Sequence, residues 1–143
     1  LVSKLINALS IKTDETVLKL SLESGYTAAL LAKVSQSVEI LDCNNDALKL
    51  TRRQLAKLDI YNVEFSTAEH LINIVKNNKK YDCLYISAIL EEGEIDESLF
   101  DLLNKGGRAI YLVRNSCCDK VYLVTRLPDD SLKREFIFDV YNK

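Results

Sequence analysis

The spacing of apolar residues along the chain predicts an alternation of helices and strands. Apolar residues recur with the helical period of about 3.6 over residues 1–9, so a short amphipathic helix opens the chain and ends before Thr13. The same pattern predicts further helices over residues 26–34, 44–58, 68–75 and 95–103. Runs rich in apolar and β-branched residues predict strands over residues 16–20, 38–42, 63–66, 82–87 and 108–113, of which 82–87 has the apolar character of a strand buried on both faces.

Turn residues complete this outline. Gly106-Gly107 comes just after the fourth of these further helices, where a glycine commonly ends a helix. Pro128-Asp129-Asp130 separates two β-prone runs, residues 120–126 and 133–140, and predicts an antiparallel hairpin. Strands that alternate with helices form a mostly parallel sheet with helices on both faces, because right-handed crossovers leave few other topologies. We therefore expect an α/β fold of one domain over residues 1–143, ending in the hairpin.

Composition adds that this fold stays out of membranes. Hydrophobic residues make up 48% of the 143 residues and charged residues 28%, which offsets the ordering entropy that keeps polar chains disordered. No run approaches the roughly 18 consecutive apolar residues of a membrane helix, and Leu1-Val2-Ser3-Lys4 lacks the apolar core of a signal peptide. These features predict a soluble, cytoplasmic protein. The chain starts at Leu1 and contains no Met, which points to an N-terminal piece outside it.

Charge and cysteine content disfavour two kinds of site. Lys and Arg number 19 and Asp and Glu number 21, a net charge of −2 with the signs interleaved, so no basic face for nucleic acid is expected. Cys43, Cys83, Cys117 and Cys118 form no Cys-x-x-Cys, and with His70 as the single histidine they offer too few ligands for a zinc site. We expect no metal and four reduced, mostly buried thiols. The adjacent Cys117 and Cys118 are interpreted as structural, since neighbours on a strand point to opposite faces.

Candidate chemistry is expected in loops that follow strands, because ligands of open parallel sheets bind outside the carboxyl ends of the strands. Four short loops meet this condition. They are residues 21–25, residues 42–43, residues 67–70 and residues 87–89.

The first of these loops lies in a run that resembles a known family. Residues 17–32, V-L-K-L-S-L-E-S-G-Y-T-A-A-L-L-A, are similar to the first motif of the protein-L-isoaspartate O-methyltransferases, V-L-E-I-G-x-G-S-G-Y-x-A-A-L-L-A. Residues 62–64, 81–88 and 102–108 and the closing hairpin also look like the corresponding family segments. The resemblance runs in order along nearly all 143 residues.

This resemblance implies a Rossmann-like class I methyltransferase that uses S-adenosylmethionine. Its fold is a mostly parallel seven-stranded sheet with helices on both faces and a C-terminal antiparallel hairpin. It implies that the backbone of the first loop approaches the methionine end of the cofactor, that Asp42 accepts the ribose hydroxyls and that Glu69 lies near the adenine. The implied cofactor-binding residues are Ser21, Glu23, Gly25, Asp42, Cys43, Glu69, His70 and Ser87. No catalytic residue is assigned.

Several of these candidates also have an ordinary structural explanation. Asp42 can help to cap the helix that follows it, and Glu69 can lie in a first helical turn, where the helix dipole favours a negative charge. Ser24 can be no more than a helix N-cap, and His70 can be a surface residue. Both interpretations stay open for Asp42 and Glu69.

Three positions depart from the family pattern in ways that oppose cofactor binding. Ser21 and Glu23 stand where the family has glycine, and Glu23 adds a negative charge to the loop that receives the cofactor's carboxylate. Lys19 stands where the family has an acidic residue that meets the cofactor's ammonium. Alternatively, Lys19 pairs with Glu23, or it takes the cofactor's carboxylate in a rearranged loop.

Two functions follow from the resemblance and its departures. The first is an S-adenosylmethionine-dependent protein carboxyl O-methyltransferase acting on L-isoaspartyl residues of a protein or peptide, a transfer that needs alignment more than acid–base chemistry. The second is a catalytically inactive methyltransferase-like scaffold or protein-interaction domain, with a homodimer as one form. A methyltransferase acting on RNA or another small molecule is a weaker third. The family also carries substrate-binding segments before the first helix and after the hairpin, which this chain does not contain.

Overall fold

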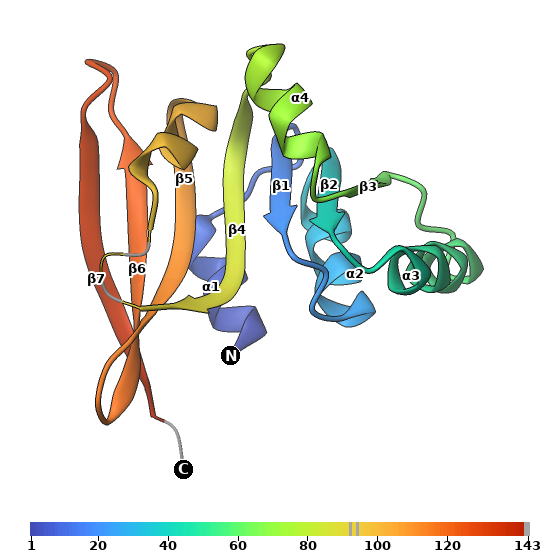
Figure 1. Ribbon diagram of the computed structural model, residues 1–143, viewed down its shortest axis with the longest axis horizontal. Helices are drawn as coiled ribbons and strands as arrows, with labels where there is room; N and C mark the ends of the chain where they lie inside the picture. Colours follow the sequence, from blue (N-terminus) through green and yellow to red (C-terminus); the bar gives the residue numbers. More distant parts are fainter. Residues whose placement is uncertain (92, 94, 142–143) are drawn as a thin grey trace.

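The computed structural model describes residues 1–91, 93 and 95–141, and within these residues seven strands form one sheet (Figure 1). The strands are β1 (Thr16–Leu20), β2 (Ser37–Asp42), β3 (Val63–Thr67), β4 (Tyr81–Leu90), β5 (Leu103–Arg114), β6 (Cys118–Arg126) and β7 (Leu132–Tyr141). The helices are α1 (Val2–Leu9), α2 (Gly25–Val34), α3 (Asn45–Lys57), α4 (His70–Lys76) and the short 3-10 helix η1 (Glu97–Leu102).

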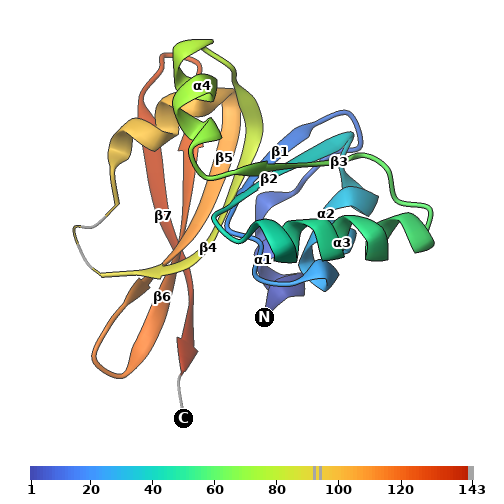
Figure 2. The same cartoon turned by 45° about the vertical axis from the view of Figure 1, so that its right-hand side comes forward.

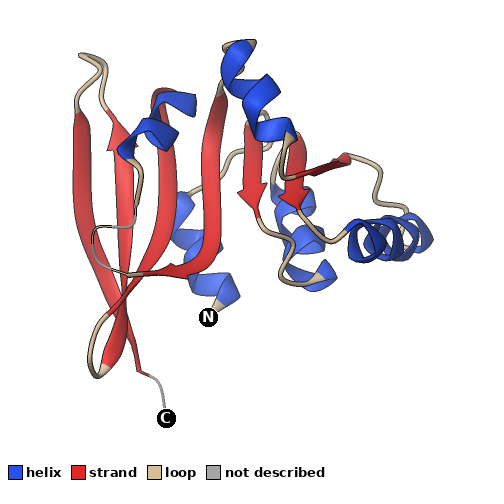
Figure 3. Cartoon of the chain, viewed as in Figure 1, coloured by secondary structure: helices blue, strands red, loops and turns tan. Residues whose placement is uncertain are grey.

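The strand order is β3-β2-β1-β4-β5-β6-β7. Neighbouring strands from β3 to β5 run parallel, whereas β6 and β7 are antiparallel to the strands beside them (Figure 3). The expected mostly parallel seven-stranded sheet with a C-terminal hairpin is therefore confirmed.

Helices cover both faces of the sheet because alternate residues of a strand point to opposite faces. In β1, Val17 packs in the core covered by α1, α2 and α3, whereas Leu18 packs in the core covered by α4 and η1. α2 and α3 lie side by side on the first of these faces (Figure 2). Residues 83–86 of β4 are all buried and alternate between the two cores, which confirms the strand predicted to be buried on both faces.

The last predicted helix is wrong in type and length. Its residues form the 3-10 helix η1, where the side chain of Asp96 accepts a hydrogen bond from Ser98 N at 3.0 Å. Gly106 and Gly107 do not end a helix, because both lie in β5. A Cβ at Gly107 would lie 2.7 Å from the carbonyl oxygen of Asn104, and Gly106 has a φ of 81°, so the glycines permit a tight, irregular start to this strand.

The loop predicted over residues 87–89 is also wrong. β4 continues to Leu90, and its pairing with β5 shifts register between Tyr85 and Ile89. An irregularity of this kind bends a strand without ending it. Ser87 therefore lies within a strand.

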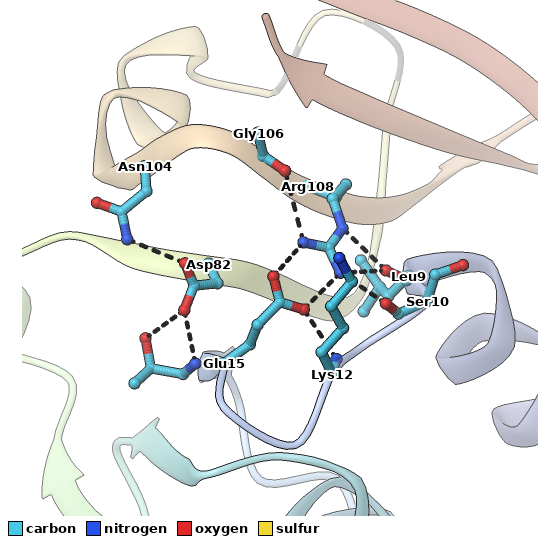
Figure 4. Close-up of polar contacts among 9 residues, drawn as sticks. Leu9, Ser10, Lys12, Glu15, Asp82, Asn104, Gly106 and Arg108 are labelled. Carbon is cyan, nitrogen blue, oxygen red and sulfur yellow. Dashed lines mark hydrogen bonds and ion pairs between the residues drawn. The ribbon is translucent and has the colours of Figure 1, made fainter. Parts of the chain in front are cut away.

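A polar network ties α1 to the edge of the sheet where β1 begins (Figure 4). Arg108 Nη2 donates to the carbonyl oxygens of Leu9 at 2.7 Å and Ser10 at 2.8 Å, and Nε donates to Leu9 O at 2.9 Å. These carbonyls end α1, so the guanidinium caps the helix C-terminus, where a cation is favoured. The same guanidinium forms a two-pronged ion pair with Glu15, with Nη1–Oε2 at 2.7 Å and Nη2–Oε1 at 2.8 Å.

Asp82 of β4 connects β1 and β5 through hydrogen bonds at the amino ends of these strands (Figure 4). Its Oδ2 accepts from Thr16 N of β1 at 2.9 Å, and its Oδ1 accepts from Asn104 Nδ2 of β5 at 3.2 Å. The carboxylate and amide groups that hold β1, β4 and β5 together thus lie at the amino ends of these strands. The carboxyl ends form the opposite edge of the parallel part of the sheet.

The cysteines correct one expectation. All four are free, as expected, but only Cys83 and Cys118 are buried, whereas Cys43 and Cys117 are exposed. The expectation that most of the thiols are buried is therefore wrong. Burial raises the pKa of the Cys83 thiol to about 12. In the part of the chain that the structure describes, no three His, Cys, Asp or Glu side chains are placed to hold a metal ion. Over the same residues, no helix has the length and apolar character needed to cross a membrane.

Candidate functional site

A pocket opens at the carboxyl ends of β1, β2 and β3. Its volume is about 340 Å³, and its walls are Leu20, Ser21, Leu41, Asp42, Cys43, Ala68 and Leu71. The strand order reverses beside it, since β2 follows β1 on one side and β4 lies on the other. Ligands of open α/β sheets bind at this kind of position, so the pocket is the candidate functional site.

Two other pockets of equal or larger volume are weaker candidates, because their charged side chains form ion pairs within the chain or because they lie away from these strand ends. One of about 340 Å³ lies over β5, β6 and β7, and another of about 510 Å³ lies between α3 and β3. The cations of the first, Arg114, Lys120 and Arg134, are each within 3.5 Å of a carboxylate of the chain. Those charges are already matched within the molecule.

Asp42 lies at the end of β2 and joins the pocket wall to the first loop. Its Oδ2 accepts from Leu22 N at 2.6 Å, and its Oδ1 accepts from Asn44 N at 2.9 Å. These backbone hydrogen bonds, that from Leu22 first, lower the pKa of Asp42 below its ordinary value, so the carboxylate is ionised at neutral pH. Each carboxylate oxygen has a second lone pair, so Asp42 can accept further hydrogen bonds from a ligand.

The first loop keeps a left-handed backbone at two residues that are not glycine. Ser21 has a φ of 84° and Glu23 a φ of 59°. Ser21 N donates to Leu41 O at 2.8 Å, and the buried Leu22 side chain anchors the loop in the core. These contacts hold Ser21 and Glu23 in a conformation that L-residues adopt at a cost of about 1–2 kcal/mol each.

The loop passes directly into α2. Ser24 is the N-cap, and its Oγ accepts from Thr27 N at 3.3 Å, which confirms the structural interpretation of this serine. The Thr27 hydroxyl donates to Glu23 Oε1 at 3.1 Å. A Cβ on Gly25 would lie 3.4 Å from Gln54 Oε1 and 3.5 Å from Thr51 Cγ2 of α3, so Gly25 lies where the two helices pack closely.

Lys19 is fully buried beneath this loop. Its Nζ donates to Ser21 O at 2.5 Å and to Ser87 Oγ at 3.4 Å, and it lies 5.3 Å from the centre of the Tyr85 ring. Burial lowers the pKa of the Lys19 ammonium to about 8, partly offset by Glu23 and Asp42. Its hydrogen-bond partners among the described residues are thus a carbonyl and a hydroxyl, and the direct pair with Glu23 weighed from the sequence does not form.

The remaining candidates lie around the pocket in different ways. Ser21, Asp42 and Cys43 are in its wall. Ser87 belongs to β4, and its Oγ donates to Leu20 O of β1 at 3.5 Å. Glu69 is exposed and precedes α4 without capping it through its side chain; a hydrogen bond from the Thr67 side chain lowers its pKa.

His70 is not part of the pocket wall. Its Nε2 lies 3.7 Å from Oε2 of Glu39, a buried carboxylate in β2 that also accepts hydrogen bonds from Lys79 and from Tyr81. This arrangement gives His70 a role in a charged cluster under α4. Its expected place beside a cofactor stays a prediction.

The apolar walls of the pocket are the part that candidate selection from the sequence missed. Leu20 and Leu41 are close to the ends of β1 and β2, and Ala68 and Leu71 flank the start of α4. Apolar residues at strand ends are the available signal, but the same residues serve equally well as core. The sequence alone does not distinguish a wall from a core position.

A family model for protein-L-isoaspartate(D-aspartate) O-methyltransferase (PCMT) matches residues 1–141 of the chain. A curated relative named protein-L-isoaspartate O-methyltransferase, from Methanoculleus marisnigri, is 30% identical over 127 residues, which are 88% of this chain and 56% of that protein. The first relatives are covered over 51% to 63% of their own length, so the chain spans little more than half of the curated proteins it matches.

Solved structures show the same fold. A protein-L-isoaspartate O-methyltransferase superposes with a TM-score of 0.77 at 20% identity, covering 97% of this chain and 44% of that one. A Plasmodium falciparum protein described by the same name, in complex with S-adenosyl-L-homocysteine, superposes with a TM-score of 0.67 at 20% identity, covering 97% and 68%. These likenesses establish the Rossmann-like methyltransferase fold.

Proposed function

Because the chain belongs to the protein-L-isoaspartate(D-aspartate) O-methyltransferase family, we propose that it acts as an S-adenosylmethionine-dependent protein carboxyl O-methyltransferase of the L-isoaspartate type. The observation that carries the proposal is the pocket at the carboxyl ends of β1, β2 and β3, with an ionised Asp42 in its wall. Ligands of open α/β sheets generally bind outside the carboxyl ends of the strands, which supports this choice of pocket.

The pocket suits the nucleoside half of S-adenosylmethionine. Leu20, Leu41 and Leu71 offer an apolar surface to a flat base, and Asp42 offers acceptor lone pairs to ribose hydroxyls. The exposed Cys43 and Ser21 complete the polar side of the wall. We place Glu69 and Ser87 at the margins of this site and leave the catalytic residues unassigned.

The transfer asks little acid–base chemistry of the protein. The bound cofactor would supply an electrophilic methyl group, and the chain would have to hold a carboxylate acceptor in line with it. A carboxylate is already a nucleophile at neutral pH, so no general base is needed. This agrees with a chain whose single histidine has its Nε2 3.7 Å from Glu39 Oε2 and lies outside the pocket wall.

The test is methyl transfer to matched peptides. The chain is incubated with S-adenosylmethionine labelled in the methyl group and with two peptides that differ only in one residue, L-isoaspartate or L-aspartate. We expect base-labile methyl ester on the isoaspartyl peptide alone. Absence of ester, under conditions in which an active family member modifies the same peptide, would contradict the proposed activity.

The departures from the family pattern favour a second candidate, an inactive methyltransferase-like scaffold or dimerisation domain. Lys19 is buried where the family has an acidic residue. Ser21 and Glu23 adopt backbone conformations typical of glycine, and hydrogen bonds within the chain stabilise this loop. This candidate predicts that the doubly substituted Ser21→Gly, Glu23→Gly chain gains methyl transfer that the natural chain lacks. Methyl transfer by the natural chain, above background and equal to that of the substituted chain, would exclude it. Sedimentation velocity measures whether the chain self-associates.

A further inference from the structure

We propose that Lys19 makes this pocket select against positive charge, so that a neutral adenine nucleoside binds more tightly than S-adenosylmethionine itself. The inference rests on the proposed function in one respect, since it takes the pocket to hold an adenine nucleoside. It concerns the part of the ligand that extends beyond the nucleoside. The residues that decide it are Lys19, Ser21, Glu23 and Thr27.

The ammonium of Lys19 lies directly behind the pocket wall. Ser21 is part of that wall, and its carbonyl oxygen accepts the 2.5 Å hydrogen bond from Lys19 Nζ. The lysine side chain is completely buried, and the Tyr85 ring packs near it. A buried cation acts on nearby charges through a medium of low dielectric constant, so its field reaches through one layer of backbone with little screening.

That charge is not neutralised by direct contact. The carbonyl of Ser21 and the hydroxyl of Ser87 are uncharged, and Glu23 and Asp42 act on Lys19 at longer range. S-adenosylmethionine carries a sulfonium and an ammonium. Each of these positive groups would be less stable near the buried Lys19 ammonium than an uncharged group at the same place.

Glu23 also disfavours binding of the carboxylate in the amino-acid tail of S-adenosylmethionine. Glu23 places its own carboxylate at the start of α2, where it accepts from the Thr27 hydroxyl at 3.1 Å. A second anion would approach this exposed carboxylate. The nucleoside half, in contrast, would face the pocket wall, which includes Asp42 and the apolar residues Leu20 and Leu41. The chain therefore fits one half of the cofactor and opposes the other.

Calorimetric titration of the purified chain at pH 7 separates the charges of the ligand. 5′-Methylthioadenosine has a neutral tail, S-adenosylhomocysteine a zwitterionic tail with a neutral sulfur, and S-adenosylmethionine the same tail with a sulfonium. We expect affinity to fall in that order, with at least about a tenfold difference between the first and the last, which corresponds to about 1.4 kcal/mol.

A substitution assigns the effect to Lys19. Lys19→Met keeps the length of the side chain and removes its charge, so S-adenosylmethionine should bind at least about tenfold more tightly while 5′-methylthioadenosine changes little. Lys49→Met, on an exposed lysine of α3, is the matched control and should change neither affinity.

The outcomes separate this inference from the proposed function. Tightest binding of S-adenosylmethionine by the natural chain, or an unchanged ratio of affinities in Lys19→Met, would overturn the inference and leave the proposed function standing. Failure of all three ligands to bind both chains would overturn the inference together with the cofactor site. The ligand series on the natural chain needs no substitution, so it decides the matter even if Lys19→Met does not fold.

Discussion

Single residues in the first loop hold conformations that their side chains disfavour. Ser21 lies at a φ of 84°, which a glycine adopts without strain, and its hydrogen bond to Leu41 O and the neighbouring Leu22–Asp42 contact keep it there. The strain is local and does not involve a contact of the serine side chain with the core. It should therefore be removable by one substitution.

We expect Ser21→Gly to raise the free energy of unfolding by about 0.5–1 kcal/mol. Relief of the left-handed strain, about 1–2 kcal/mol, exceeds the extra entropy that glycine gives the unfolded chain. Urea denaturation followed by circular dichroism measures the change. Ser24→Gly, where φ is −150°, is the control and should lower stability by a few tenths of a kcal/mol, since it removes the cap of α2. A loss of stability in Ser21→Gly would show that the serine hydroxyl, and not the backbone, matters.

A second prediction at this scale concerns the stability cost of burying Lys19. Its pKa in the folded chain, about 8, lies below the ordinary value of 10.5, so the unfolded chain binds more protons between these two values. The natural chain should therefore gain stability as the pH rises from about 8 towards 10.5. Lys19→Met should be more stable at pH 7 by about 1–3 kcal/mol and should lack this gain. Parallel curves of stability against pH for the two chains would contradict the buried charge.

At the scale of elements, some local sequence signals predict a different element from the one that forms. Lys105 to Arg108 follow a predicted helix, and the glycines there suggested its end. In the structure the glycines lie within β5, which begins at Leu103, and Arg108 caps a different helix, α1, through carbonyl oxygens 98 and 99 positions away in the chain. Local pattern predicts an element from its neighbours in sequence, so a cap supplied by a distant strand leaves no local signal.

The Arg108 cap supports a prediction about α1. Arg108→Lys should lower the free energy of unfolding by about 2–3 kcal/mol, because an ammonium cannot reproduce the paired contacts to Glu15 and to the carbonyl groups that end α1. Arg53→Lys, an exposed position on α3, should change it by less than about 0.5 kcal/mol. Hydrogen exchange of α1 amides would locate the loss, and unchanged exchange in α1 would contradict the capping role.

At the scale of the whole molecule, the sequence predicts the fold more fully than the site. Alternating strands and helices, together with the hairpin turn at Pro128, indicated the sheet because each element carries its own periodicity. The pocket has no such periodicity in the sequence, because its wall combines residues from three strand ends that are distant in sequence. The rule about strand ends predicts the loops that contain Ser21, Asp42 and Cys43, and the family resemblance implies these residues within them. The burial of Lys19 and the position of His70 beside Glu39 depend on packing between elements that are distant in sequence.

Asp42 joins the pocket to the stability of the sheet, which gives a prediction for the whole molecule. Asp42→Asn should weaken binding of adenine nucleosides at least about tenfold and lower the free energy of unfolding by about 1–2 kcal/mol. The reason is that one of the two carboxylate oxygens, which accept from Leu22 N and Asn44 N, is replaced by an NH₂ group that can only donate. Titration calorimetry and urea denaturation measure the two effects. Asp46→Asn, an exposed residue in the first turn of α3, is the matched control and should leave nucleoside binding unchanged. Loss of stability without loss of binding would place the ligand elsewhere.

The positions of the cysteines make the pocket observable by chemical labelling. Cys43 is exposed in the pocket wall, Cys117 is exposed beside the hairpin, and Cys83 is buried. A maleimide should therefore modify Cys43 and Cys117 in the native chain, and a bound nucleoside should slow the first reaction while leaving the second unchanged. Peptide mass spectrometry would measure both modification rates in one sample, so the Cys117 rate serves as an internal reference for the effect of a bound nucleoside on the Cys43 rate.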